Sequence, residues 1–205
     1  MTSSSATSES KSTTTITTTT TTINEVPVKV IFLDVDGVLC LNEYATLEQP
    51  LLQNLSIAVE NTGACVAVSS DWRLFPSKFQ ELCRALKLRN IRVIGKTAVS
   101  TKDNARPQEI FQFLTTFHAR MKRQSKPFRI TRWLAVDDRA LNFEEGGEKM
   151  TSRKFVQTDP AKGLTFNVAM EIVNKLNRTS SSSSNSKVVE RSLIGAASSG
   201  TTSCN

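Results

Sequence analysis

The stretch that decides the fold is Lys29-Val-Ile-Phe-Leu-Asp-Val-Asp-Gly-Val-Leu39. Its first half is an apolar run without polar alternation, which is typical of a strand buried on both faces of a parallel sheet. Asp34 and Asp36 end this run, and Gly37 lets the backbone turn sharply after it. Carboxylates at the end of a buried strand must be paired or bound to a metal, because an isolated buried charge is costly. Mg²⁺ suits this place, since it prefers oxygen ligands and leaves coordination positions for a substrate phosphate.

Two further apolar runs end in polar side chains. Residues 65–70 read Cys-Val-Ala-Val-Ser-Ser, and residues 133–138 read Trp-Leu-Ala-Val-Asp-Asp. Taken singly, each ending is also compatible with a turn or a helix cap. The carboxyl ends of parallel strands, however, meet at the edge where open α/β sheets bind ligands. Three strands that each end in acids or hydroxyls therefore predict one site at that edge.

Apolar runs alternate with amphipathic segments along the chain. This alternation predicts an α/β fold with a doubly wound, Rossmann-like parallel sheet and right-handed crossovers. We expect strands at 30–33, 65–68, 91–94, 133–136 and 155–156, and helices at 51–61, 76–88, 108–118 and 165–176.

The order of these motifs resembles the haloacid dehalogenase (HAD) superfamily of phosphotransferases. Asp34-Val-Asp-Gly37 matches its first motif, Ser69 its second and Asp137-Asp138 its fourth. Within the superfamily, the chain resembles the phosphatase half of polynucleotide kinase-phosphatases and related RNA-repair HAD domains. That likeness covers roughly residues 27 to 177 and rests on Ser69-Ser-Asp-Trp-Arg73, Lys102-Asp-Asn-Ala-Arg-Pro-Gln-Glu-Ile-Phe111 and Val136-Asp-Asp-Arg139.

The resemblance implies a role for each motif residue. Asp34 would be the nucleophile that carries the phosphoryl group as an aspartyl-phosphate. Mg²⁺ would be bound by the Asp34 carboxylate, the backbone carbonyl of Asp36 and Asp138. Asp36 would protonate the leaving oxygen and then activate water, and Ser69 would hydrogen-bond a phosphate oxygen. Asp137 would either bind the metal through water or orient Asp138.

The third motif departs from the family pattern. The family places a lysine, or sometimes an arginine, near the start of the helix before the Asp-Asp strand, whereas Pro107 stands at the matching position here. Arg106 is the nearest cation and our first choice for this role, and Lys102 is the second. Ser70 is a weaker choice than Ser69 for the second motif, because the family places the hydroxyl directly after the apolar residues.

The resemblance implies a Mg²⁺-dependent phosphomonoester hydrolase. Residues 38–68 must hold a helix and a strand, which leaves no room for a cap domain. Capless members act on macromolecules, so the expected substrate is a polynucleotide end or another bulky phosphate. A protein phosphatase is the alternative, disfavoured because Val38 stands where those enzymes carry threonine. A catalytically inactive HAD domain that serves as a binding module is disfavoured because all four motif aspartates are present.

Composition sets the boundaries of the domain. The chain has 205 residues, and residues 1–23 and 179–205 are rich in Ser and Thr, which predicts disordered tails around a HAD-like domain at 24–178. No apolar run is long enough to span a membrane, so we expect no membrane partner and a location in the cytoplasm or nucleus. The sequence does not determine the oligomeric state, and a monomer is the expected one. An organellar transit peptide is less favoured, because the first arginine is Arg73. His118 is the only histidine and lies far from the motifs, so histidine-based catalysis is not expected.

The chain is basic, with a formal net charge of +7. Much of this charge lies in residues 120–132, which we interpret as a solvated loop at the edge of the sheet opposite the site rather than a nucleic-acid patch. Loops after the strands are expected to place further cations around the site: Arg73, Arg139, Lys149, Arg153, Lys154 and Lys162.

Overall fold

The computed structural model describes residues 25–102, 104–124 and 128–178. The predicted tails at 1–23 and 179–205 lie outside the described residues. The strands are β1 (Val26–Leu33), β2 (Cys65–Val68), β3 (Val93–Lys96), β4 (Phe128–Asp137) and β5 (Phe155–Gln157), and the helices are α1 (Gln49–Thr62), α2 (Pro76–Lys87), α3 (Arg106–Arg123) and α4 (Phe166–Asn177). The strands form one sheet in the order β3-β2-β1-β4-β5, and each pair is parallel. The predicted α/β class and doubly wound sheet are confirmed.

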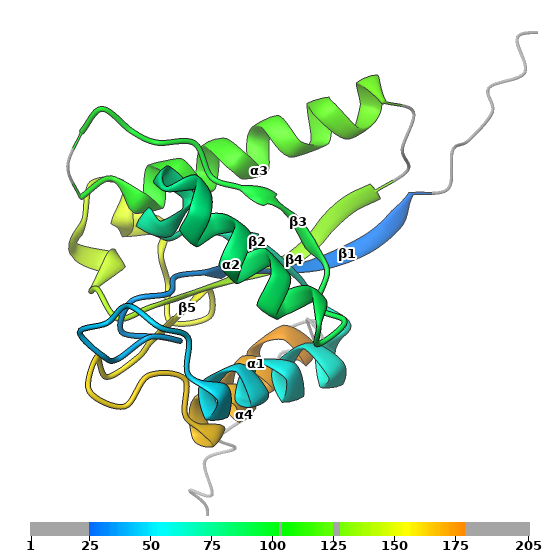
Figure 1. Ribbon diagram of the computed structural model, residues 1–205. Coiled ribbons are helices and arrows are strands. Elements are labelled where there is room, and N and C mark those ends of the chain that lie inside the picture. Colours follow the sequence, from blue (N-terminus) through cyan, green and yellow to red (C-terminus); the bar gives the residue numbers. More distant parts are fainter. Residues whose placement is uncertain (1–24, 103, 125–127, 179–205) are drawn as a thin grey trace, which may run out of the picture.

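The apolar run of β1 forms the centre of the molecule, because both of its faces are covered. Ile31 and Leu33 point to one face, where they pack with buried side chains of α1, α2 and α4. Phe32 points to the other face and meets Phe113 of α3 edge to face, with ring centroids 5.4 Å apart. Figure 1 shows α3 on one side of the sheet and α1 with α4 on the other.

The strand order reverses between β1 and β4, since α3 carries the chain from β3 across to β4. A doubly wound sheet binds ligands at such a switch point, outside the carboxyl ends of the strands. Between β1 and β2 the structure places only a loop and α1, so among the described residues no cap domain covers this edge. None of the described helices is long and apolar enough to cross a bilayer.

The start of α3 is set by Pro107, which lies in the first turn, where its missing N–H would have no helical partner. The helix therefore begins at Arg106, two residues earlier than expected, at the same edge of the sheet as the ends of β1 and β4. Farther along α3, His118 accepts a hydrogen bond from the backbone N–H of Ile130.

The basic segment 120–132 is not one loop, so that prediction is wrong in part. Its first residues continue α3 to Arg123, and β4 already begins at Phe128. Phe128 pairs with Val26, so β1 and β4 run on together beyond the rest of the sheet (Figure 1). Apolar and polar residues alternate from Phe128 to Thr131, which is a strand pattern that the charge of the segment concealed. β3 begins two residues later than predicted, at Val93.

Candidate active site

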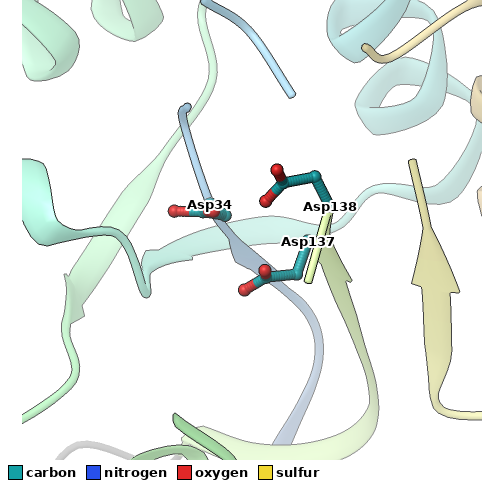
Figure 2. A group of neighbouring side chains, drawn as sticks. All are labelled: Asp34, Asp137 and Asp138. Carbon is teal, nitrogen blue, oxygen red and sulfur yellow. The ribbon is translucent and has the colours of Figure 1, made fainter. Parts of the chain in front are cut away.

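Three carboxylates meet where β1 and β4 end. Ligand oxygens of Asp34, Asp137 and Asp138 lie within 4.8 Å of one another (Figure 2). The parallel register places Leu33 beside Val136, so the next residues on both strands are neighbours. Asp34 N–H donates to the carbonyl of Val136 at 3.0 Å, which continues this register past the end of β1. The two strands thus bring together acids that are far apart in the sequence.

Arg106 compensates part of this negative charge. Its Nη1 lies 2.9 Å from Asp34 Oδ1 and 2.9 Å from Asp137 Oδ2, and its Nη2 lies 3.0 Å from Asp71 Oδ1. Arg106, Asp34 and Asp137 are all buried, so the ion pairs among them are shielded from water, whereas Asp71 is exposed. Lys102 lies on the surface instead and pairs with Glu145 at 2.6 Å. The structure therefore places Arg106, and not Lys102, against the carboxylate of Asp34.

Burial raises the pKa values of Asp34 and Asp137. Desolvation and the charge of Asp137 raise the pKa of Asp34 from 3.8 to about 7, although Arg106 acts in the opposite direction. Desolvation likewise raises the pKa of Asp137 to about 6, again against the charge of Arg106. One guanidinium does not balance the negative charge of the cluster, so a second positive charge would favour the ionised forms of Asp34 and Asp137.

The donor set fits a hard divalent cation. Asp34, Asp137 and Asp138 offer only oxygen atoms, and Asp138 is half-buried, which leaves one side of the cluster open. Carboxylate oxygens beside open positions suit Mg²⁺, which keeps part of its coordination sphere for water or phosphate.

Gly37 makes room for Asp138. The glycine has a φ of +67°, and a Cβ at this position would clash with the carboxylate of Asp138. Its carbonyl accepts a hydrogen bond from the hydroxyl of Thr158 at 2.9 Å, which fixes the turn after β1 against the segment that follows β5. A side chain at position 37 would therefore displace a carboxylate of the cluster.

The two serines after β2 make different contacts. Ser69 is 2% exposed, and within the described residues its hydroxyl has no hydrogen-bond partner. Its backbone N–H donates to Leu33, which places it in register beside Asp34. The Ser70 hydroxyl accepts a hydrogen bond from the N–H of Trp72, and its proximity lowers the pKa of Asp34 against the effect of burial. An unpaired buried hydroxyl beside Asp34 offers a contact for a ligand oxygen.

Asp36 lies apart from the three clustered carboxylates. Its side chain is exposed, and Oδ1 accepts a hydrogen bond from the indole N–H of Trp72 at 2.9 Å. Trp72 itself is buried, so it holds one oxygen of Asp36 in place while the carboxylate remains open to solvent.

A buried ion-pair network behind the site was not foreseen from the sequence. Arg73 Nη2 pairs with Glu109 at 2.7 Å, and Arg73 Nη1 lies 3.3 Å from the Asp71 oxygen that also binds Arg106. Glu109 additionally accepts from the N–H of Ser100 at 2.7 Å. One sequence signal could have indicated this network: the spacing of Arg106 and Glu109, which places both residues in the first turns of α3. Arg73 lies on the loop after β2 as expected, but it is buried and paired with Glu109 instead of being an exposed cation of the rim.

Three other expected rim cations also lie elsewhere. Lys154 Nζ lies 4.9 Å from the ring centroid of Trp133, and Lys149 Nζ lies 5.8 Å from that of Phe111. The loop after β4 returns to the start of β5, which carries Arg153 and Lys154 toward the beginning of that strand and away from the carboxylates. The side chains of Lys149 and Lys154 thus lie against the α3 face of the sheet.

A comparison with known families gave one match. The family described as "HAD domain in Swiss Army Knife RNA repair proteins" matches residues 30–169, a range that contains the aspartates of the site, Ser69 and Arg106. No curated protein and no solved structure matches the chain.

Proposed function

The chain belongs to the HAD domain family of Swiss Army Knife RNA repair proteins, and we propose that it is a Mg²⁺-dependent phosphomonoester hydrolase acting on polynucleotide ends. The observation that carries this proposal is the cluster of Asp34, Asp137 and Asp138 with Arg106 bound against two of its members. A purely structural role would not require three carboxylates around an open position. Such an arrangement is costly to bury, and it fits a site that binds a metal and a phosphate.

Asp34 is the nucleophile of the proposed reaction. Its carboxylate forms a bond to phosphorus while the bond from phosphorus to the ester oxygen breaks, which leaves an aspartyl-phosphate and an alcohol. Asp36 donates the proton that the leaving oxygen takes up. In the second step Asp36 accepts a proton from water as the water oxygen attacks phosphorus, and Asp34 is released as a carboxylate.

The surrounding residues prepare Asp34 for this role. Its pKa of about 7 shows that the buried carboxyl needs positive charge to stay ionised, and Arg106 provides one such charge at 2.9 Å. When bound, Mg²⁺ would supply the remaining charge and offset the negative charge of the phosphoryl group. Asp137 and Asp138 would hold it together with Asp34.

Two groups are suited to hold the phosphate oxygens. The Ser69 hydroxyl is buried beside Asp34 and has no partner within the described residues. The guanidinium of Arg106 presents a planar array of donors that matches phosphate, and it is held by the side chains around it. Trp72 fixes one oxygen of Asp36, so the other oxygen remains available for proton transfer.

The open edge of the sheet favours a macromolecular substrate. No cap encloses the carboxylates within the described part of the chain, so a terminal phosphate can enter while the rest of the molecule stays outside. The family description names RNA repair, which suggests that the terminal phosphate belongs to a nucleic acid.

A substrate panel tests this function. The purified protein is assayed with p-nitrophenyl phosphate, end-phosphorylated oligonucleotides and phosphopeptides, with Mg²⁺ or with EDTA. We expect Mg²⁺-dependent release of phosphate, fastest with oligonucleotides. Preferential hydrolysis of phosphopeptides would favour a protein phosphatase, and the absence of hydrolysis with every substrate would favour an inactive binding module.

A further inference from the structure

A cleft of about 510 Å³ opens beside the carboxylates, and Arg106 lines both places. Its walls come from three loops at the carboxyl edge of the sheet: the loop after β2 contributes Leu74, the loop after β3 contributes Val99 and Lys102, and the loop after β4 contributes Arg139. The volume lies in the range of pockets that bind small molecules. A group attached to a phosphate at Arg106 therefore has this cleft as its neighbour.

One part of the cleft wall is apolar and exposed. Leu74 is 47% exposed and Val99 is 55% exposed, although both are large apolar side chains on loops that have polar neighbours. Burying them against a flat apolar ligand would remove this surface from water, which is favourable in proportion to the area. The face of a nucleobase is such a surface.

Another part of the cleft wall is cationic. The Lys102 ammonium has three donors and uses one for Glu145, and Arg139 uses Nη2 for Asn104 and Glu144. The remaining donors of both side chains make no hydrogen bond within the described residues. The acids of the same wall, Asp71 and Glu109, are already paired with buried arginines, so Lys102 and Arg139 are the groups that can bind a further anion.

We propose that this cleft is a nucleotide subsite, which binds the unpaired nucleoside next to the phosphate that is removed. The base lies against Leu74 and Val99, and the following phosphodiester lies near Lys102 and Arg139. A base within a duplex would first have to leave the stack, so the subsite selects single-stranded ends. This inference deepens the proposed function and rests on it for the position of the reacting phosphate.

A polynucleotide fits this wall better than a phosphopeptide does. A polynucleotide repeats a negative charge at every residue beside a flat base, and the cleft offers both a cationic and an apolar part. The backbone next to a phosphorylated side chain in a peptide carries no such charge. Binding of the repeated charge releases counterions, so the affinity falls as the salt concentration rises.

The test uses the double variant Leu74→Ser/Val99→Ser of the full chain. Its matched control is Leu88→Ser, because Leu88 is 78% exposed and follows α2 at the other edge of the sheet. For each protein, kcat/KM is measured with p-nitrophenyl phosphate, with end-phosphorylated single-stranded hexanucleotides and with the same ends in a blunt duplex. The ratio of single-strand to aryl phosphate turnover should fall at least roughly tenfold in the double variant, by analogy with base stacking in single-strand binders, and stay unchanged in the control. The wild type should prefer the single strand to the duplex.

A binding measurement separates failure of the subsite from failure of the proposed function. Fluorescence anisotropy of a labelled, phosphorylated hexanucleotide is recorded with wild-type protein and with both variants, at two salt concentrations. If no ester is hydrolysed but the double variant binds at least roughly tenfold more weakly, the proposed function is wrong and the subsite stands. If the double variant binds and hydrolyses oligonucleotides as the control does, or if only phosphopeptides depend on Leu74 and Val99, the subsite is wrong.

Discussion

Replacing Arg106 with methionine should destabilise the protein and inactivate the site together. Methionine keeps much of the apolar stem but removes a guanidinium that lies 2.9 Å from both Asp34 and Asp137. Removing one partner of a buried ion pair leaves an uncompensated charge and costs about 3–5 kcal/mol. We expect this loss in urea unfolding with EDTA present, and a fall in kcat of about 10²-fold or more, as when a group that stabilises transition-state charge is removed.

The loss of stability should depend on pH with a definite sign. Without Arg106 the pKa values of Asp34 and Asp137 rise further above the ordinary value of 3.8, so the folded protein takes up protons that the unfolded chain has released. Stability then falls as the pH rises above 3.8, and the difference between wild type and variant should be smaller at pH 5 than at pH 8.

Lys102→Met is the matched control for this prediction. Lys102 precedes the same helix and is the other candidate for the third motif, but its pair with Glu145 is exposed and should add little stability. The reasoning is refuted if Arg106→Met unfolds within about 1 kcal/mol of wild type and stays active. It is equally refuted if Lys102→Met causes the larger loss with p-nitrophenyl phosphate.

Three further predictions concern the metal cluster and the tails. Gly37→Ala should lower the free energy of unfolding by about 1–2 kcal/mol, because position 37 has a left-handed backbone. It should also raise the Mg²⁺ concentration needed for half-maximal activity, because the added Cβ displaces Asp138. An unchanged Mg²⁺ titration would contradict the close approach of Gly37 to Asp138. Mg²⁺ should raise the melting temperature more at pH 8 than at pH 5.5. The reason is that the raised pKa of Asp34 makes the metal-free protein lose stability as the pH rises from about 4 to 7. Calorimetry that shows the reverse order would exclude Asp34 as a ligand. A chain of residues 24–178 should melt within a few degrees of the full chain and keep its activity, since the Ser/Thr-rich ends lack apolar residues for a core; a large drop would show that a tail packs on the domain.

The carboxylate cluster was predictable because its signals are local. The apolar run before Asp34 identifies a buried parallel strand, and the same pattern before Asp137 identifies a second one. In a doubly wound sheet the carboxyl ends of parallel strands lie at the same edge, where ligands bind, so the ends of these two strands are expected to lie together. The same reasoning indicated Ser69 beside Asp34, and the structure places it there.

The ion-pair network was not predictable because it depends on contacts between distant segments. Arg73 looks like a surface cation until Glu109, which is 36 residues away, is placed beside it. Whether Arg106 or Lys102 reaches Asp34 depends on where the loop before α3 runs, and no local pattern reports this. The prediction for Lys154 was wrong although the strand expected at 155–156 follows it directly, because a residue that precedes a parallel strand lies at the edge opposite the carboxylates.

The most direct measurement is the Mg²⁺-dependent hydrolysis of p-nitrophenyl phosphate by Asp34→Asn beside the wild-type protein. Asparagine keeps the size of the side chain but is a much poorer nucleophile, and within the part of the chain that the structure describes no other carboxylate takes the place of Asp34 beside Ser69 and Arg106. If Asp34 forms the covalent intermediate, kcat should fall by several orders of magnitude while the melting temperature in EDTA stays the same or rises, because the variant no longer buries an ionisable carboxyl. A variant that is folded and keeps more than about a tenth of the wild-type rate would contradict the covalent mechanism.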